Sequence, residues 1–289
     1  MYYEGAVYRP PSEAYSLIVQ ATIGCAHNRC TFCYMYKGEK FRVRELKEVI
    51  NDLKQARTQY PRVRRIFIAD GDALSIPYSQ LEKILITIKE IYPECERVGI
   101  YACPRDLLEK TLEELKGLKE LGLGIIYMGL ESGSDEVLQA VHKGVTAQEA
   151  IEAGQKAVTS GIQLSLTVIS GLGGRANWQT HAIETGKVLS RIDPRYVGLL
   201  TLMLQEGTTL KRQIDQGKFQ LLSPEEIMKE TRLMLEHTAV TACIFRSNHA
   251  SNYVSLRGTL PQDKKNLLEK IDGILNHGFN YKHEYFRGL

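Results

Sequence analysis

Residues 17–36 read LIVQATIGCAHNRCTFCYMY. The fold follows from the apolar run that opens this stretch and from similar apolar runs further along the chain. The stretch begins with an apolar run that is typical of a buried strand, and a short loop with three cysteines follows it. Up to about residue 203, similar apolar runs alternate with longer segments that have a helical period. This alternation predicts parallel strands joined by crossover helices, so we expect the α/β class.

Six strand–helix units are expected. The predicted strands are residues 17–23, 65–69, 98–103, 124–130, 163–169 and 196–203. In the fifth strand, Ser165 and Thr167 alternate with Leu164 and Leu166, so one face is polar although a parallel sheet is normally buried on both faces. An open doubly wound sheet and a barrel both fit six units, and a polar lumen is the simplest account of this alternation. We therefore predict a partial (β/α)6 barrel of the TIM type.

The composition is that of an ordinary globular protein. The chain has 289 residues, of which 43% are hydrophobic and 25% are charged, and its net charge is +3. This composition excludes the disordered, collagen and coiled-coil classes, and so small a charge disfavours a nucleic-acid partner. The sequence has no apolar run of the roughly 18 residues that a membrane span needs and no signal-peptide pattern at its start. We expect no membrane association and a cytoplasmic location.

The cysteine loop predicts a metal centre. Cys25, Cys30 and Cys33 fall within nine residues directly after the first strand, at the strand end where a parallel barrel carries its chemistry. A [4Fe–4S] cluster accepts four ligands, so three thiolates leave one iron open to another ligand. Phe32 would shield such a cluster from water. The scattered cysteines are expected to be small buried hydrophobic residues: Cys95, Cys103 and Cys243.

Zinc is the alternative occupant of the loop. Cys25, His27, Cys30 and Cys33 could form a Cys3His set. Structural zinc is usually bound by pairs of ligands from two separated parts of the sequence. His27 is too close to Cys25 in the sequence for both to bind one tetrahedral ion easily. The iron–sulfur cluster is therefore the favoured prediction, and His27 is expected to act as a hydrogen-bonding residue of the loop.

The loop resembles the cluster motif of the radical S-adenosylmethionine (radical SAM) superfamily, which has three cysteines with an aromatic residue before the third. The usual spacing is C-x3-C-x2-C, and this chain has one additional residue between Cys25 and Cys30. The resemblance covers residues 15–209, and the chain is similar to the group that shares its core with the Elp3, MiaB and NifB proteins. It implies a core domain of residues 1–209 and a helical C-terminal extension of residues 210–289 that closes the barrel.

The resemblance also implies a binding site for S-adenosyl-L-methionine (SAM). Members of the superfamily hold the methionyl amino group with a short glycine-containing segment after the second strand, where this chain has Gly71 and Asp72. Arg105, after the third strand, could pair with the methionyl carboxylate or with an acidic substrate. The alternatives are an ordinary turn at residues 70–73 and a surface or helix-start position for Arg105.

Two further segments complete the implied SAM site. Glu131 and Ser132 follow the fourth strand, where the superfamily often places polar groups for the ribose hydroxyls and the methionyl moiety. Ser170 and Gly171 follow the fifth strand, where the superfamily packs the adenine. Taken without the resemblance, the glycine-rich run that begins at Gly171 is only a flexible loop.

By resemblance, the protein is a radical SAM enzyme that acts on a small-molecule substrate. A reduced [4Fe–4S] cluster would cleave SAM to a 5′-deoxyadenosyl radical, which abstracts a substrate hydrogen. The resemblance implies a flavodoxin- or ferredoxin-type protein as the reductant. Two rivals stay open: a non-catalytic iron–sulfur carrier for electron transfer, and a barrel enzyme with structural zinc.

Residues 245–253, which read FRSNHASNY, are the candidate substrate segment. A partial barrel has an open side, and the chain after the sixth strand is what can cover it. We expect Arg246 to meet an anionic group of the substrate, and His249 or Tyr253 to transfer a proton or hydrogen. The alternative is a capping turn for the last helix.

Overall fold

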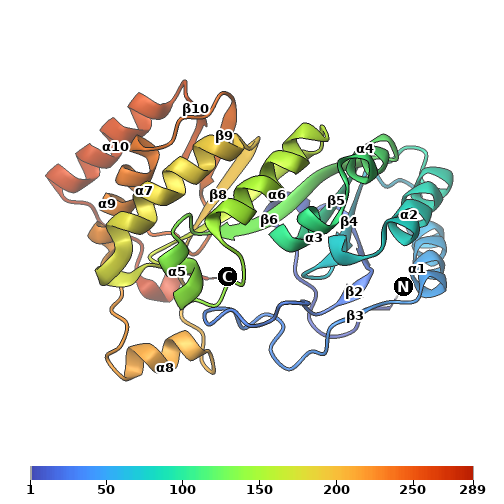
Figure 1. Ribbon diagram of the computed structural model, residues 1–289, viewed down its shortest axis with the longest axis horizontal. Coiled ribbons are helices and arrows are strands. Elements are labelled where there is room, and N and C mark those ends of the chain that lie inside the picture. The colour runs from blue at the N-terminus through green and yellow to red at the C-terminus, as the bar shows by residue number, and fades with distance from the viewer. Residues whose placement is uncertain (1, 289) are drawn as a thin grey trace. The chain divides into compact units, whose positions relative to one another are not determined.

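The computed structural model describes residues 2–288 (Figure 1). Its strands are β1 (Leu17–Gln20), β2 (Thr22–Ile23), β3 (Arg42–Val43), β4 (Arg65–Ala69), β5 (Arg97–Ala102), β6 (Leu123–Glu131), β7 (Gln163–Ser170), β8 (Tyr196–Thr201), β9 (Cys243–Ser247) and β10 (Leu256–Leu260). Its α-helices are α1 (Leu46–Gln59), α2 (Tyr78–Ile91), α3 (Pro104–Glu109), α4 (Leu112–Glu120), α5 (Asp135–Ala140), α6 (Ala147–Thr159), α7 (Gly174–Ile192), α8 (Thr209–Asp215), α9 (Pro224–Glu236) and α10 (Lys264–His277). Short 3-10 helices are η1 (Pro11–Glu13), η2 (Ala73–Ser75) and η3 (Glu284–Phe286).

The main sheet follows the order of the chain. Within residues 2–288 its strand order is β1-β4-β5-β6-β7-β8-β9-β10, and β2 and β3 form a separate two-stranded sheet. Strands β1, β4, β5 and β6 pair in parallel, as do β7, β8 and β9, whereas β10 is antiparallel to β9. Helices separate the successive parallel strands from β4 to β9, so the predicted α/β class is confirmed.

The first predicted strand is divided at Ala21. The N–H of Ala21 donates to the carbonyl of Ala69 on β4, and the carbonyl of Ala21 accepts from the N–H of Arg44. Strand β1 therefore pairs with β4, and β2 turns to pair with β3. The cysteine loop therefore starts from strand β2, which pairs with β3 and directly follows the two hydrogen bonds of Ala21.

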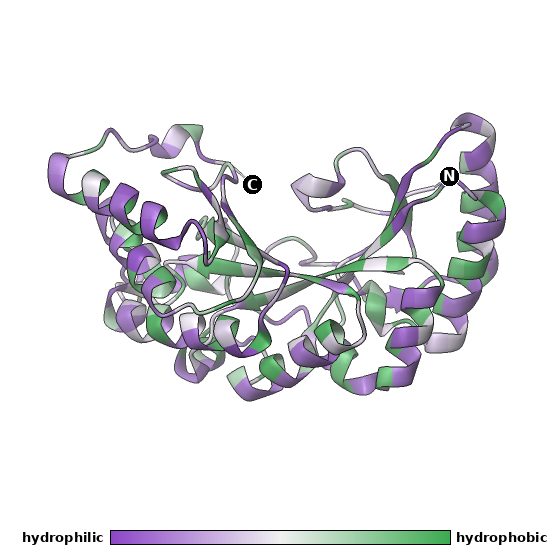
Figure 2. Cartoon of the chain, turned by 90° about the horizontal axis from the view of Figure 1, so that it is seen from above, coloured by the Kyte–Doolittle hydropathy of each residue, from purple (hydrophilic) through white to green (hydrophobic). Residues whose placement is uncertain are grey.

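The residues form two compact units, and the first comprises residues 2–28, 35–128 and 156–164. In it, β4 is buried from Ile66 to Ala69, and α1 and α2 bury Leu53 and Leu85. Figure 2 shows helices that alternate between hydrophobic and hydrophilic residues, as expected for helices that cover a sheet with one face. Gly122, two residues after α4, has a positive φ and takes the helix-ending position predicted for it.

The second unit comprises residues 29–34, 129–155 and 165–288. Along β7, Leu166 and Val168 are buried and Ser165 and Thr167 are half-buried, as the predicted polar face requires. Helix α9 packs against both α7 and α10 in this unit. Among residues 2–288, no helix combines the length and the apolar character that a membrane span requires.

The C-terminal segment contains strands as well as helices. Helices α9 and α10 lie in the predicted helical extension, and strands β9 and β10 lie between these two helices. The hairpin of β9 and β10 continues the main sheet, and β10 was not predicted. A reason is Gly258 in the middle of β10, since glycine has a low strand propensity. The domain boundary at residue 209 stays a prediction.

Candidate functional site

Asp70 fastens both ends of the cysteine loop. Its buried carboxylate accepts hydrogen bonds from the N–H of Gly24 (3.4 Å), at the start of the loop, and from the hydroxyl of Tyr36 (2.7 Å), at its end. Gln20 donates a third hydrogen bond, at 3.1 Å. Burial raises the pKa of Asp70, and these hydrogen bonds oppose that rise. Asp70, the residue that follows β4, therefore holds the first and last residues of the loop in place.

Gly71 makes room for the ring of Tyr36. A Cβ atom at this position would lie 2.9 Å from Cζ of Tyr36, which is closer than real Cβ atoms come. Tyr36 is itself buried and lies at the end of the cysteine loop. The absence of a side chain at Gly71 thus serves the packing of the loop, and the predicted contact with the SAM amino group stays a prediction.

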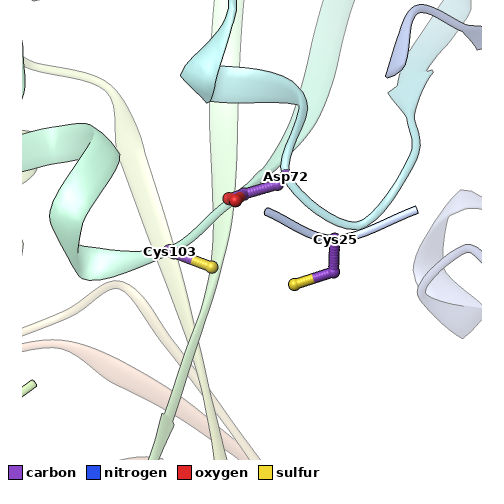
Figure 3. Close-up of side chains that lie close together, drawn as sticks. All are labelled: Cys25, Asp72 and Cys103. Carbon is purple, nitrogen blue, oxygen red and sulfur yellow. The ribbon is translucent and has the colours of Figure 1, made fainter. Parts of the chain in front are cut away.

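Asp72 lies beside Cys25. Its Oδ2 accepts a hydrogen bond from the N–H of Ala26 (3.2 Å), the residue after this cysteine. Figure 3 shows the carboxylate of Asp72 next to the thiols of Cys25 and Cys103, and the three ligand atoms lie within 4.8 Å of one another. Asp72 is 2% exposed, and its Oδ1 accepts no hydrogen bond from an N–H or hydroxyl group of the described residues.

The thiol of Cys25 is acidic. A hydrogen bond from the Cys103 thiol lowers the pKa of Cys25 to about 7, the backbone of Asn28 acts in the same direction, and burial opposes both. A cysteine with a pKa near 7 is about half ionised at neutral pH, and the thiolate is the form that binds iron. Cys25 therefore fits the first ligand position of an iron–sulfur cluster.

Sequence reasoning missed Cys103, and the expectation that it is a buried hydrophobic residue is wrong. The residue follows β5, is half-buried and hydrogen-bonds to Cys25. The expectation holds for Cys243, which is fully buried. The signal in the sequence was the position of Cys103 at the carboxyl end of the third predicted strand, because the carboxyl ends of parallel strands meet at one edge of a sheet.

Asp106 was also missed. Its Oδ2 accepts from the N–H of Cys103 (2.8 Å) in a capping box at the start of α3. Burial, followed by the neighbouring Asp72, raises the pKa of Asp106 to about 9, so this carboxyl carries a proton at neutral pH. Strand β5 ends at Ala102, so the strand alternation does not extend to Arg105. Arg105 is exposed in the first turn of α3, which is the helix-start alternative.

Cys30, Cys33 and Phe32 belong to the second unit. The N–H of Thr31 donates to Val141, and its carbonyl accepts from Leu210, which fixes this part of the loop against α5 and α8. Phe32 packs against an apolar group of buried side chains: Val137, Val141, Leu172, Leu202 and Leu210. The convergence of Cys30 and Cys33 with Cys25, and the shielding by Phe32, stay predictions.

A cavity of about 370 Å³ lies beside the apolar group. Its floor includes Val141 and Leu172, and Arg175 and Lys218 also line it. The first turn of α7, from Gly174, forms part of its wall. This volume is large enough for a small organic molecule.

Glu131 has a strained backbone and a partly satisfied side chain. Its φ is +63°, which is uncommon for a residue other than glycine. Its Oε1 accepts from Nζ of Lys143 at 3.0 Å, while its buried Oε2 has no hydrogen-bond partner among residues 2–288. An unsatisfied buried acceptor fits the hydroxyl groups of a ribose. Ser132 is already engaged, because its hydroxyl contacts Nδ1 of His181 (2.8 Å) and accepts from the N–H of Ser134.

Glu230 connects α9 to the end of β7. Its Oε1 accepts from the hydroxyl of Ser170 (2.6 Å) and from the N–H of Gly171 (2.7 Å), and Nε2 of His181 lies 3.9 Å away. Burial raises the pKa of Glu230 to about 7 and lowers the pKa of His181 to about 4. The predicted adenine-binding residues Ser170 and Gly171 are therefore held by a buried acid that sequence reasoning missed. No motif marks Glu230, which lies some sixty residues further along the chain.

The candidate substrate residues lie in and after β9. Arg246 is exposed on this strand and donates to the carbonyls of Phe245 and Gly258. Nδ1 of His249 lies 3.0 Å from the hydroxyl of Ser251, and the residue is half-buried.

The hydroxyl of Tyr253 hydrogen-bonds to Glu284 and accepts from Arg287, whose guanidinium lies over the Tyr253 ring. The hydroxyl of Tyr253 is therefore already engaged, whereas the exposed Arg246 donates its hydrogen bonds to Phe245 and Gly258 from Nη1. The substrate roles of Arg246, His249 and Tyr253 stay predictions.

Two solved structures share the fold. Methylornithine synthase (PylB) has a TM-score of 0.54 and 17% sequence identity, over 93% of this chain and 74% of that chain. The radical S-adenosylmethionine methyltransferase TsrM from Kitasatospora setae, solved with cobalamin and a [4Fe–4S] cluster, has a TM-score of 0.55 and 18% identity, over 75% of this chain and 43% of that chain. These likenesses confirm the partial-barrel fold class predicted from the sequence.

The sequence comparisons agree with the fold. The heme chaperone HemW of Bacillus subtilis is 24% identical over 181 residues, which make up 62% of this chain and 46% of HemW. The chain thus spans about half the length of this relative. Residues 19–183, more than half of the chain, match the family model of the radical SAM superfamily, and the protein therefore belongs to that superfamily.

Proposed function

We propose that the protein is a radical SAM enzyme that binds a [4Fe–4S] cluster through Cys25, Cys30 and Cys33 and binds SAM at the cluster's open iron. When bound, these two groups supply the one-electron cleavage of SAM to methionine and a 5′-deoxyadenosyl radical that abstracts hydrogen from a substrate. The protein supplies the positions of the ligands and excludes water.

The observation that carries the proposal is the setting of Cys25. Its thiol is acidic at the strand end of a parallel sheet, and Asp70 and Asp72 hold the backbone on either side of it. A carrier of electrons needs no open ligand position and no polar groups around it. The unsatisfied oxygen of Glu131 instead favours an enzyme that also binds a polar cofactor.

The chain's own residues take the following roles in this proposal. Asp72 and the Gly71 carbonyl accept from the methionyl ammonium, and Arg105 pairs with a carboxylate. Glu131 and Ser132 contact the ribose and the methionyl moiety, with Oε2 of Glu131 as the acceptor that is still unsatisfied. The backbone at Ser170 and Gly171 faces the adenine, and Phe32 shields the cluster.

The proposed substrate is a small molecule, and the proposed reductant is a flavodoxin- or ferredoxin-type protein of the cytoplasm. A cavity of about 370 Å³ in the second unit supports a small substrate. Arg246, His249 and Tyr253 are the proposed substrate residues. Alanine at Arg246 or His249 should leave the cluster and the substrate-free cleavage of SAM intact while turnover of the true substrate is lost.

We expect anaerobic reconstitution with iron and sulfide to give one oxygen-sensitive [4Fe–4S] cluster per chain. After reduction with dithionite, liquid chromatography should detect 5′-deoxyadenosine and methionine in equal amounts. Cys25→Ala, Cys30→Ala and Cys33→Ala should each abolish both the cluster and the cleavage. Cys95→Ala is the matched control and should change neither, because the thiol of Cys95 donates to the carbonyl of Arg97 at the opposite, amino-terminal end of β5.

Each alternative has its own outcome in this experiment. A fully reduced cluster that produces no 5′-deoxyadenosine above a cluster-free control would indicate an iron–sulfur carrier. Zinc as the only stoichiometric metal, bound equally by the Cys103→Ala variant, would indicate the barrel enzyme with structural zinc. Retention of the cluster in all three single variants would contradict the assignment of its ligands.

A further inference from the structure

Three side chains with metal-binding atoms meet in the first unit. Cys25 lies in the cysteine loop, Asp72 follows β4 and Cys103 follows β5, and their ligand atoms lie within 4.8 Å of one another (Figure 3). Backbone hydrogen bonds fix two of these positions, because Asp72 accepts from Ala26 and the N–H of Cys103 donates to Asp106. The donor atoms are therefore assembled before any ligand is present.

The carboxylate of Asp72 is the observation that points to a cation. The residue is 2% exposed, and Oδ1 accepts no hydrogen bond from an N–H or hydroxyl group within residues 2–288. The carboxyl of Asp106, which carries a proton at neutral pH, hydrogen-bonds to Asp72, so two acids are buried side by side next to two thiols. An ionised carboxylate buried beside two thiolates is costly unless a cation neutralises the charge. A positive ion at this point would balance that charge.

The donor set selects the kind of ion. Two sulfurs and one carboxylate oxygen suit a borderline-soft divalent ion such as Zn²⁺, whereas Mg²⁺ and Ca²⁺ prefer oxygen ligands alone. In a tetrahedral zinc site with Zn–S bonds of about 2.3 Å, the ligand atoms lie roughly 3.5 to 3.8 Å apart. Side-chain shifts of about 1 Å would bring the three atoms from their present separations to that geometry.

We propose that the cluster-free protein binds one Zn²⁺ ion through Cys25, Asp72 and Cys103, with water at the fourth position. On binding, each thiol loses its proton to solvent and no electron is transferred. The ion uses Cys103 and Asp72, which are not ligands of the proposed iron–sulfur cluster.

The site has a consequence that rests on the proposed function. Cys25 is also a ligand of the proposed cluster, so a Zn²⁺ ion bound to this thiolate competes with the cluster for it. Zinc in this site therefore lowers the yield of cluster assembly until it is removed.

The first test uses Co²⁺ as a spectroscopic probe for Zn²⁺ in anaerobic, cluster-free protein. We expect one Co²⁺ per chain, with thiolate-to-metal absorption and the visible bands of tetrahedral cobalt, and displacement by one equivalent of Zn²⁺. Cys103→Ala and Asp72→Asn should each weaken binding more than about 100-fold, since each removes a direct ligand. The matched control is the double variant Cys30→Ala/Cys33→Ala, which should bind Co²⁺ within about twofold of wild type.

The opposite pattern would overturn the proposal. If Cys103→Ala binds Co²⁺ as wild type does and the double variant does not, the ion is held by the cysteine loop instead. Absence of stoichiometric binding by folded wild-type protein, as judged by circular dichroism, would also overturn it. Cys103→Ser serves as a second variant in case the alanine variant does not fold, and it should lose the thiolate absorption as well.

The second test separates this inference from the proposed function. Wild-type protein that is preloaded with one equivalent of Zn²⁺ should form at least about tenfold less cluster than zinc-free protein. In Cys103→Ala, zinc should change the cluster yield by less than about twofold. An equal effect of zinc on both proteins would refute the competition. If zinc-free wild type forms no cluster, the proposed function fails, whereas the Co²⁺ titration still decides the zinc site.

Discussion

Gly71→Ala is expected to lower the free energy of unfolding by about 3 to 5 kcal/mol and to reduce cluster yield more than tenfold. The new Cβ would overlap the ring of Tyr36, with Cζ only 2.9 Å away. Overpacking of a buried site costs about 1 to 3 kcal/mol, and the displaced ring also loses its hydrogen bond to the charged Asp70, worth about 1.5 to 3 kcal/mol. Because Tyr36 ends the cysteine loop, the loop loses its position as well.

Urea unfolding and iron analysis after reconstitution measure these two effects. Gly273→Ala is the matched control, because Gly273 lies in α10 with nothing within 4 Å of an added Cβ. That variant should be as stable as wild type or more stable by about 0.5 to 1 kcal/mol.

A double-mutant cycle tests the cause. In a Tyr36→Ala background, Gly71→Ala should cost less than about 1 kcal/mol, since the ring is gone. A full cost in that background, or a Gly71→Ala protein within about 0.5 kcal/mol of wild type, would show that the ring does not require glycine at this position.

Glu230→Gln should stabilise the protein at pH 8 by up to about 3 kcal/mol and leave its stability unchanged near pH 4.5. Burial raises the pKa of Glu230 from 4.5 to about 7 in the folded protein. Between these values the folded state holds a proton that the unfolded state has released, so the free energy of unfolding falls as the pH rises. The raised pKa of Glu230 therefore stabilises the folded protein below about pH 4.5, and this contribution is lost as the pH rises to about 7. Glutamine keeps the acceptor for Ser170 and Gly171 and does not titrate.

Urea unfolding of both proteins from pH 4.5 to 8 gives the difference directly. His181 has the opposite sign: its lowered pKa contributes stability above 6.5 that is lost as the pH falls toward 4. Because Nε2 of His181 lies 3.9 Å from Oε1 of Glu230, the two titrations are coupled, and the difference at about pH 8, where His181 is neutral in the folded and unfolded states, isolates the contribution of Glu230. Glu236→Gln, at the exposed end of α9, is the control and should differ from wild type by less than about 0.5 kcal/mol at every pH. A difference between Glu230→Gln and wild type that does not change with pH would mean that Glu230 is ionised throughout.

Local pattern was sufficient to predict most of the strands and helices. The runs that became β4, β5, β6 and β8 are short and largely apolar, β7 alternates between polar and apolar residues, and the intervening segments keep a helical period. The split of the first strand at Ala21 depends on partners at Ala69 and Arg44, which no local signal provides. Strand β10 was missed because Gly258 weakens its pattern.

The parts of the candidate site that consist of neighbouring residues in the sequence could be predicted. The parts that folding brings together from distant positions could not. The cysteine loop and the segments at Gly71 and Glu131 are visible in the sequence. Arg105 lies in the first turn of α3, which begins at Pro104, and its role in binding stays a prediction.

The sequence by itself determined the α/β class, the order of the strands and the three-cysteine loop, because each of these depends on residues that are neighbours along the chain. Only the tertiary structure decided that Cys103 and Asp72 lie beside Cys25, and that Glu230 supports Ser170. These contacts join residues some thirty to eighty positions apart. They exist because parallel strands bring their carboxyl ends to one edge, and side-chain packing then determines which residues at that edge touch.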